Sequence, residues 1–330
     1  MGSLMKSWWM QVADGAAELE LKITQQPQPG PTQLQVRMRA ASLNRGEFIL
    51  AHGLHSKGVG AKAVGMEAAG EVVACGASVT QFQVGDKVLG RCPGAFAEYV
   101  LMDEREAMAM PANLSWQEAA SIPLVLLVVF DMLVLQGKAQ RGDWVLLAGV
   151  TSGVGVGSLQ MAKALGAKVI GTSGSQTKLD RLQAHGLDVG ICTRAPDFHA
   201  AVMQATGGKG VNLVVNAVGG SVFAECVKSM AFEGRLATVG YVDGVMDGAM
   251  DIEALHAKRL TLFGVSNKLR TAEQKAHSLP AFRTQVLPMI SQGRFKPLVD
   301  KTFAFEHLVQ AKAFMDGNQQ VGKIVLNGSL

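Results

Sequence analysis

The middle of the chain carries nine residues with the composition of a phosphate-binding turn, Gly149-Val150-Thr151-Ser152-Gly153-Val154-Gly155-Val156-Gly157. They follow the apolar run Trp144–Ala148 and open into Ser158–Leu165, which is rich in helix formers. Glycine lets the backbone approach a pyrophosphate, and a helix N-terminus offers free N–H donors with a partial positive charge. The match to G-x-G-x-x-G is degenerate, and a tight strand-to-helix turn is the plainer alternative. In this context we predict a dinucleotide site.

The residues after this turn bear on which dinucleotide binds. An NAD site normally places an acid about 20 residues further on, where it holds the ribose 2′-hydroxyl. No Asp or Glu occurs between Val156 and Leu179, and the expected strand at 168–171 leads into Thr172, Ser173 and then Lys178. Hydroxyls and an ammonium suit a 2′-phosphate, which an acid would repel. We therefore predict NADP(H), although Lys178 could also be a solvated helix lysine.

Composition excludes several classes of protein. The chain has 330 residues, 48% of them apolar, and a net charge of +4, so it is not a disordered chain. Its basic residues are scattered and only 6% of residues are aromatic, which argues against nucleic-acid binding. The most apolar stretch, residues 119–130, is interrupted by Pro123 and is shorter than the ~18 residues that span a bilayer. The four cysteines form no C-x-x-C pair. We expect a cytoplasmic protein without a membrane or nucleic-acid partner.

The pattern of apolar and turn residues changes twice along the chain. Residues 5–114 contain short alternating runs broken by turns, which predict a twisted antiparallel sheet. Residues 123–266 alternate continuous apolar strands with helices, which predicts a doubly wound parallel sheet covered on both faces. The last zone is too short to form a domain alone. We therefore predict one domain from residues 1–122 with 267–330, and a second from residues 123–266.

Two further segments carry a family resemblance. The run Gly65-Met66-Glu67-Ala68-Ala69-Gly70-Glu71-Val72, followed by Val84-Gly85-Asp86-Lys87-Val88, resembles the signature of medium-chain dehydrogenases/reductases. Together with the glycine turn and Gly322-Lys323-Ile324-Val325, the chain resembles the zinc-independent quinone oxidoreductase (zeta-crystallin-like) branch. The resemblance implies an α/β chain with a GroES-like, mostly-β catalytic domain, an inserted Rossmann doubly wound parallel-sheet domain, the nicotinamide in the cleft between them, and a homodimer.

The resemblance also implies site residues. Thr193 stands where relatives often have a tyrosine near the adenosine phosphate, and Arg194 could substitute for it. The expected cofactor contacts are Asn44, Val128, Thr151, Ser152, Gly153, Val154, Gly155, Thr172, Ser173, Lys178, Thr193, Ala217, Gly240, Tyr241 and Phe263. The catalytic candidates are Asn44, His52 and Tyr241, although a histidine such as His52 or His55 could simply lie in a surface loop.

The sequence departs from the family at several cleft positions. The usual tyrosine, arginine and threonine are replaced by Ile49, Ala51 and Val128, which predicts a drier cleft and excludes a tyrosine proton donor there. Zinc enzymes of the superfamily have a histidine before the glutamate, but this chain has Met66, and the early cysteine ligand falls near Asn44. A thioether and isolated thiols cannot build a tetrahedral zinc site. We therefore expect no metal.

The remaining chemistry leaves the substrate open. Without metal, hydride transfer depends on positioning and on a polar group that stabilises the developing oxyanion. The first hypothesis is an NADPH:quinone oxidoreductase that acts on a quinone or another activated carbonyl or alkene. Its alternatives are a 2-enone or enoyl-thioester double-bond reductase and a non-enzymatic, crystallin-like NADPH-binding protein. Cys92 could be a reactive thiol or a buried structural cysteine.

Overall fold

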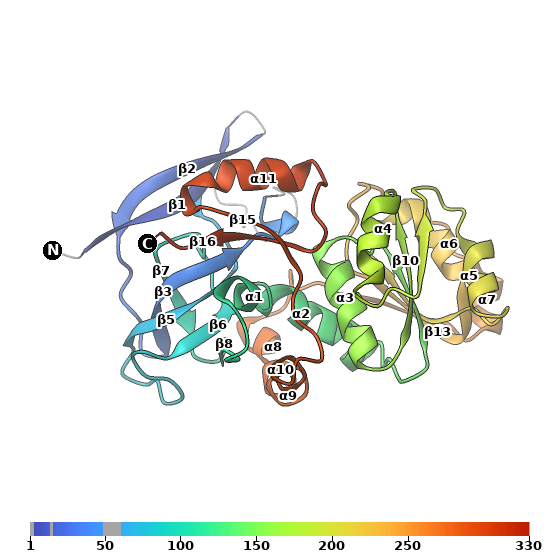
Figure 1. The fold of residues 1–330 in the computed structure, drawn as a ribbon, viewed down its shortest axis with the longest axis horizontal. Coiled ribbons are helices and arrows are strands. Elements are labelled where there is room, and N and C mark those ends of the chain that lie inside the picture. The colour runs from blue at the N-terminus through green and yellow to red at the C-terminus, as the bar shows by residue number, and fades with distance from the viewer. Residues whose placement is uncertain (1–2, 14–15, 49–60, 330) are drawn as a thin grey trace. The chain divides into compact units, whose positions relative to one another are not determined.

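The computed structural model describes residues 3–13, 16–48 and 61–329. The chain divides into two compact units, which are described separately (Figure 1). Unit 1 consists of residues 1–127 with 268–330, and unit 2 consists of residues 128–267. The divisions thus follow Leu127 and Asn267, whereas the sequence placed them after residues 122 and 266.

Unit 1 is built on two sheets that are almost wholly antiparallel. The larger contains β15 (Val299–Phe303), β16 (Lys323–Asn327), β3 (Gln33–Ser42), β5 (Glu67–Cys75), β6 (Lys87–Arg91) and β8 (Ala107–Ala109) in that order, with β7 (Tyr99–Asp103) also paired to β3. The smaller contains β2 (Ala16–Gln25), β1 (Leu4–Ala13) and β4 (Lys62–Ala63). The strand β16 pairs with β3 through Val325 opposite Ser42. Segments from both ends of the chain therefore share one sheet.

The short helices of unit 1 join these strands. They are η1 (Arg45–Phe48), α1 (Trp116–Ala120), α8 (Ala272–Ala276), α9 (Leu279–Gln285), α10 (Leu287–Ser291), η4 (Phe305–His307) and α11 (Leu308–Asp316). The helix α1 begins with a capping box, in which Ser115 Oγ accepts from the Glu118 N–H and the Glu118 carboxylate accepts from the Ser115 N–H.

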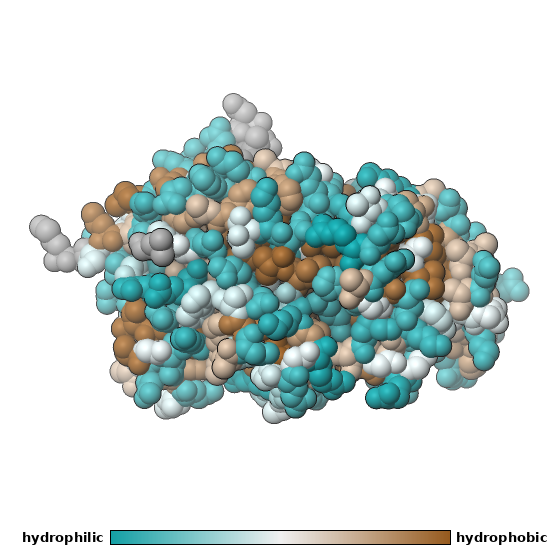
Figure 2. Space-filling model, in the orientation of Figure 1, coloured by the Kyte–Doolittle hydropathy of each residue, from teal (hydrophilic) through white to brown (hydrophobic). Residues whose placement is uncertain are grey.

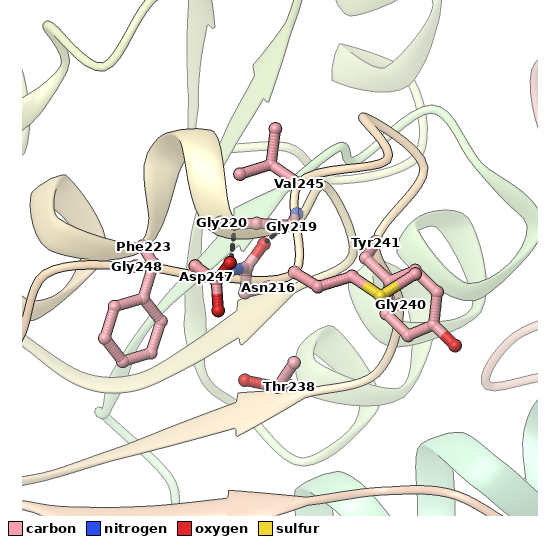
Figure 3. A pocket seen from close by; sticks show the side chains of 11 residues that line it. Asn216, Gly219, Gly220, Phe223, Thr238, Gly240, Tyr241, Val245, Asp247 and Gly248 are labelled. Atoms are coloured by element: carbon pink, nitrogen blue, oxygen red, sulfur yellow. Dashed lines mark hydrogen bonds between the residues drawn. The ribbon is translucent and has the colours of Figure 1, made fainter.

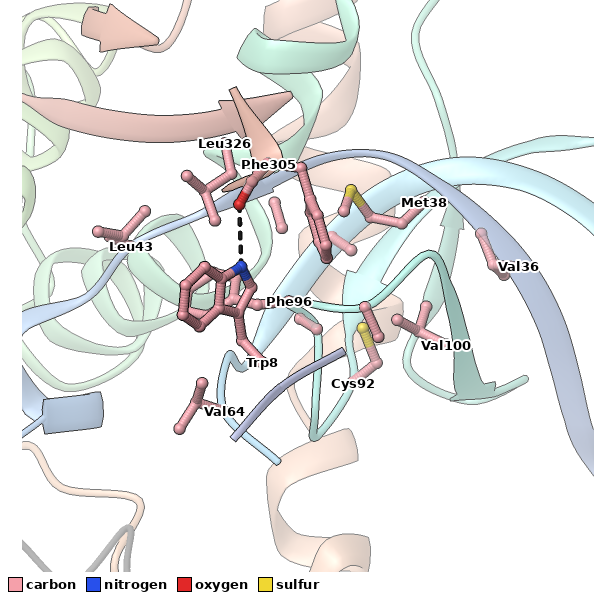
Figure 4. Close-up of a cluster of buried hydrophobic side chains, with 14 of the residues drawn as sticks. Trp8, Val36, Met38, Leu43, Val64, Cys92, Phe96, Val100, Phe305 and Leu326 are labelled. Atoms are coloured by element: carbon pink, nitrogen blue, oxygen red, sulfur yellow. Dashed lines mark hydrogen bonds between the residues drawn. The ribbon is translucent and has the colours of Figure 1, made fainter. Parts of the chain in front are cut away.

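The core of unit 1 joins the N-terminal strands to the C-terminal segment (Figure 4). The buried indole of Trp8 donates from Nε1 to the carbonyl of Phe305 across 2.9 Å. Phe96, Met38 and Leu326 belong to the same buried cluster. This packing satisfies the one polar atom of a large side chain, so Trp8 adds apolar area without an unpaired donor.

Unit 2 has the doubly wound architecture that the sequence predicted. Its parallel strands lie in the order β11 (Val189–Cys192), β10 (Lys168–Ser173), β9 (Trp144–Ala148), β12 (Val211–Asn216), β13 (Met230–Thr238) and β14 (Thr261–Gly264). The helices α3 (Gly153–Ala164) and α4 (Gln176–Gln183) lie on one side of the sheet, with α5 (His199–Ala205), α6 (Phe223–Lys228) and α7 (Ile252–Ala257) on the other (Figure 1). Successive strands are added on one side of β9 and then on the other, so the strand order reverses between β9 and β12, the place where such sheets bind ligands.

The apolar run after Pro123 has strand-like propensity but forms a helix, α2 (Pro123–Phe130). Pro123 occupies its first position, where its missing N–H costs nothing. The next N–H, from Leu124, donates to Glu67 Oε2 across 2.6 Å, and a carboxylate at a helix N-terminus is stabilising. Tertiary contacts thus override the propensity of the β-branched residues. A π-helical turn, η2 (Asp131–Gln136), continues from α2.

The distribution of hydrophilic and apolar residues on the surface is that of a chain with scattered charges. On the face shown in Figure 2, hydrophilic residues predominate and apolar residues form separate groups. Among the described residues, no helix has the length and apolar character needed to cross a bilayer.

Candidate functional site

The glycine turn of unit 2 joins the end of β9 to the start of α3. Ser152 caps α3, since its Oγ accepts from the Gly155 N–H across 3.0 Å and donates to the Gly149 carbonyl across 3.0 Å. A Cβ on Gly155 would lie 2.5 Å from that carbonyl oxygen, so the turn closes only around glycine. The N–H groups of Gly153 and Val154 have no intrahelical acceptor because they stand in the first turn. The turn can therefore cradle an anion such as a pyrophosphate.

The predicted 2′-phosphate residues follow at the carboxyl end of β10. Thr172 is buried, and its Oγ1 accepts from the Gly149 N–H across 3.2 Å, so it supports the glycine turn. Ser173 and Lys178 are half-buried, Ser173 at the strand end and Lys178 in the first turn of α4. No carboxylate follows β10 before α4. Hydroxyl, backbone and cationic groups thus gather where an NAD site would carry an acid.

Arg194 reaches the same strand end from β11. A Cβ on Gly174 would lie 2.1 Å from Arg194 Nε, so the arginine side chain lies directly against this glycine. Arg194 is exposed. Its neighbour Thr193 donates to Asp197 Oδ1 across 2.7 Å and accepts from the Ala195 N–H, so its hydroxyl is engaged within its own turn. Of these two positions, Arg194 is better suited to a phosphate.

A pocket of about 390 Å³ opens at the carboxyl ends of β12 and β13 (Figure 3). Two predicted contacts, Gly240 and Tyr241, line it, as does the exposed Met246. The full lining is Asn216, Gly219, Gly220, Phe223, Thr238, Gly240, Tyr241, Val245, Met246, Asp247 and Gly248. A small apolar pocket with a few polar groups at this edge of the sheet is typical of a ligand site.

Asp243 forms hydrogen bonds to both loops that surround this pocket, the one after β12 and the one after β13. Its Oδ2 accepts from the N–H and the hydroxyl of Ser221, and its Oδ1 accepts from the Val245 N–H across 2.9 Å. Partial burial opposes ionisation, but these hydrogen bonds outweigh it and hold the pKa of Asp243 below its ordinary value. A Cβ on Gly219, at φ +135°, would lie 1.9 Å from the same carboxylate. Sequence reasoning missed this contact, because an exposed Asp in a loop carries no signal.

Asn44, the predicted site residue of unit 1, lies in a buried polar cluster. Its Nδ2 donates to Glu47 Oε1 across 3.0 Å and to Glu67 Oε1 across 2.8 Å. Its Oδ1 accepts from Lys323 Nζ across 2.7 Å. Burial raises the pKa of Glu47 to about 8; the Asn44 hydrogen bond and Lys323 oppose the rise, and Glu67 adds to it. The sequence singled out Asn44 but gave no role to Lys323 or to its ion pair.

The other predicted residues divide between the described and undescribed parts of the chain. His52, with Ile49, Ala51 and His55, lies outside the described residues. Val128 lies on α2, Ala217 directly follows β12, and Phe263 lies on β14 opposite Ala237 of β13. The structure thus brings the glycine turn, the end of β10, Ala217 and Gly240 to one edge of the sheet in unit 2.

The buried cysteine of unit 1 does not have the surroundings of a reactive thiol. Cys92 is fully buried in the core. Burial raises its pKa, and the charges of Glu67 and Glu47 raise it further, so Cys92 stays protonated and a poor nucleophile. Among the residues that the structure describes, no three His, Cys, Asp or Glu side chains are grouped so that they could hold a metal ion.

Comparison with known proteins gives two family matches. Residues 30–112 match the alcohol dehydrogenase GroES-like domain, and residues 153–279 match the zinc-binding dehydrogenase family. Mycobacterial Rv1454c, solved in complex with NADPH, superposes with a TM-score of 0.85 at 26% identity, covering 98% of this chain and 99% of that one. CurK enoyl reductase superposes with a TM-score of 0.84 at 25% identity, covering 98% and 99%.

Curated relatives are much longer proteins. The phthioceranic/hydroxyphthioceranic acid synthase of Mycobacterium bovis is 31% identical over 318 residues, which cover 94% of this chain. The match covers 14% of that protein. Three polyketide synthases match over 12–15% of their length, so this chain spans a small part of each of these relatives.

Proposed function

Because this chain belongs to the medium-chain dehydrogenases and reductases, we propose that it is a zinc-independent, NADPH-dependent enoyl reductase. The substrate class is an α,β-unsaturated thioester or ketone, whose carbon–carbon double bond is reduced. The likeness to CurK enoyl reductase over nearly the whole chain carries this proposal, and the polyketide synthase relatives agree with it. None of the relatives named above carries the name of a quinone reductase, so the first hypothesis from the sequence lacks this support.

The residues of unit 2 fit a dinucleotide. The turn around Gly155 leaves the N–H groups of Gly153 and Val154 for a pyrophosphate, and no side chain heavier than hydrogen fits at Gly155. Ser173, Lys178 and Arg194 supply the hydroxyl and cationic groups that a 2′-phosphate needs. These residues support NADPH over NADH as the reductant.

The chemistry that a reduced nicotinamide supplies when bound is a hydride for the β-carbon of the enoyl substrate. Charge then develops on the carbonyl oxygen of the substrate, and a hydrogen-bond donor is needed there. Tyr241 lines the pocket at the ends of β12 and β13 and is the described residue whose hydroxyl we assign to that oxygen. The proton for the α-carbon comes from solvent, which completes the reduction.

Zinc has no part in this proposal. Position 66 is a methionine, and the Asn44 side chain is engaged with Glu67, Glu47 and Lys323. The carbonyl is therefore activated by hydrogen bonds alone. Stoichiometric zinc in the purified protein would overturn this part of the proposal without affecting the substrate class.

The test is oxidation of NADPH, with NADH in parallel, in the presence of crotonyl-CoA, cyclohexenone or benzoquinone, each against a substrate-free control. We expect turnover of the enoyl substrates and, with NADPH deuterated at C4 of the nicotinamide, deuterium at the β-carbon of the product. Turnover of benzoquinone alone would establish a quinone reductase instead. Binding of NADPH without turnover of any acceptor would establish the non-enzymatic alternative.

A further inference from the structure

The pocket at the carboxyl ends of β12 and β13 lies wholly within unit 2. In Figure 3, Phe223 and Tyr241 stand on opposite sides of it, and Thr238 lies between them at the end of β13. Val245 and Met246 add apolar side chains to the lining, although 41% of Val245 and 74% of Met246 remain exposed. An apolar lining that is open to solvent gains free energy when an apolar ligand covers it.

The amide of Asn216 and the N–H of Gly220 are engaged within the protein. Asn216 is 1% exposed and donates from Nδ2 to the Gly219 carbonyl across 2.9 Å. Its Oδ1 accepts from the N–H groups of Val218 and Gly219, both across 3.0 Å. The Gly220 N–H donates to the Val245 carbonyl across 2.8 Å, which joins the two loops. A nucleotide base needs partners for its ring and amino groups, whereas this amide is committed to its own turn.

The charged groups at this pocket are carboxylates. Asp247 is exposed and lines the pocket, and the Asp243 carboxylate lies against Gly219 in the same pair of loops. None of the described residues that line the pocket is basic. A phosphate or a carboxylate would be repelled here, because like charges repel at short range. An anionic ligand is therefore excluded, and the apolar lining favours a hydrocarbon group.

We propose that this pocket binds the acyl tail of the substrate, the hydrocarbon chain beyond the β-carbon. The proposal rests on the proposed function and deepens it, because it names the substrate class as enoyl compounds with an uncharged tail of medium length. Tyr241 connects the tail to the reacting group, since its hydroxyl is assigned to the substrate carbonyl oxygen and it lines the same pocket. The volume of about 390 Å³ is at the lower end of the range for small-ligand pockets, which suits one unbranched tail.

The test measures reduction of the N-acetylcysteamine thioesters of trans-2-butenoic, trans-2-hexenoic and trans-2-octenoic acid by NADPH. These substrates share one head group and differ only in the tail. Each added CH₂ that leaves water should raise kcat/KM about threefold to fourfold, chiefly through KM, because the tail is buried equally in the ground state and the transition state. Equal kcat/KM for the three thioesters would overturn the inference.

Bulky substitutions in the loop after β13 test whether the tail lies in this pocket. Met246→Trp and Val245→Trp should lower the octenoyl-to-butenoyl ratio of kcat/KM by at least about tenfold, because an indole takes up the space of the tail. Val242→Trp is the matched control, since Val242 is 66% exposed in the same loop and is not among the described residues that line the pocket. Urea unfolding checks that each variant folds, and the exposed Met246 position tolerates a larger side chain. Wild-type ratios in both lining variants would overturn the inference.

The carboxylate at the pocket allows a second measurement. A trans-2-octenoyl thioester whose tail ends in a carboxylate should have a kcat/KM at least about tenfold below that of the methyl-terminated thioester. Asp247→Asn should narrow this difference by about threefold, whereas Glu253→Gln, at an exposed position of α7, should not. The same difference in the wild type and both variants would contradict a tail beside Asp247.

NADPH affinity, read from nucleotide fluorescence, distinguishes the acyl tail from the nucleotide as the occupant. A loss of about tenfold in Met246→Trp, together with the wild-type ratio for the thioesters, would assign the pocket to the nucleotide and overturn the inference. Wild-type protein that reduces none of the three thioesters overturns the proposed function. Wild-type protein that reduces all three equally well overturns only the assignment of the tail, which separates the two failures.

Discussion

The N–H of Leu124 donates to Glu67 Oε2 across 2.6 Å, although the two residues are 57 positions apart. The contact ties the first turn of α2 to β5, and the other oxygen of the same carboxylate holds Ser42, Asn44 and Lys323. One glutamate thus joins the helix α2, the three strands β3, β5 and β16, and the side chain of Asn44.

Glu67→Gln is expected to lower the free energy of unfolding by about 3–5 kcal/mol, because it leaves the buried ammonium of Lys323 without a countercharge. Urea unfolding measures this change. The matched control is Glu71→Gln on the same strand, whose ion pair with Arg39 is half-exposed and worth about 0–1 kcal/mol. Equal losses in the two variants would contradict the prediction.

Glu47 should make stability depend on pH. Its pKa is about 8 in the folded protein against an ordinary value of 4.5, so its contribution is fully present below pH 4.5 and lost as pH rises to about 8. Relative to Glu47→Gln, the wild type should lose up to about 1.4 kcal/mol per pH unit in that window. Unfolding curves from pH 5 to about 9 test this, with Glu253→Gln, at an exposed position of α7, as control. Parallel curves for wild type and Glu47→Gln would disprove it.

Arg194→Ala should separate NADPH from NADH. Loss of a charged hydrogen bond to the 2′-phosphate predicts a Kd for NADPH that is roughly tenfold to a hundredfold higher, with NADH unchanged. Arg141→Ala is the control, since Arg141 also lies against a glycine, Gly166, but precedes β9 and so stands at the amino ends of the strands. If both variants bind NADPH like the wild type, Arg194 is not a phosphate ligand.

Gly155→Ala should damage the nucleotide site and the fold together. The new Cβ would lie 2.5–2.6 Å from the backbone of Gly149 and Val150, which cannot move as a flexible side chain could. Overpacking of this kind costs about 1–3 kcal/mol. Gly264→Ala, at a position with nothing within 4 Å, should leave both the melting temperature and NADPH affinity close to the wild type. If Gly155→Ala kept the melting temperature and the NADPH affinity of the wild type, the close packing of Gly155 against Gly149 and Val150 would be refuted.

The sequence predicted the elements of unit 2 well because each strand is a short apolar run bounded by turn residues. Trp144–Ala148 matches β9 residue for residue, and the turn that follows has the glycines that its geometry requires. The likeness to relatives agreed with the GroES-like and Rossmann assignment. Local pattern was sufficient there because the strand and its turn are neighbours in the chain.

Other features could not be predicted from local pattern. Lys323 meets Asn44 across 279 positions, and a lysine in an apolar strand gives no sign of its partner. The pocket at the ends of β12 and β13 is formed by two loops. The carboxylate of Asp243 connects these loops by accepting hydrogen bonds from Ser221 and Val245. Cys192 is exposed at the end of the edge strand β11, whereas Cys92 and Cys226 are buried, and nothing in the sequence around them distinguishes these positions.

The pairing of β16 with β3 constrains the order in which parts of the chain can fold during synthesis. A ribosome releases β3 and β5 early, then all of unit 2, and β16 with Lys323 only near residue 327. Unit 2 is one continuous segment and can close while the rest is still being made. Glu67 has no countercharge until Lys323 emerges, so it must stay hydrated until then. Unit 2 can therefore fold before Lys323 is synthesised, whereas the buried ion pair between Glu67 and Lys323 forms only after β16 has emerged.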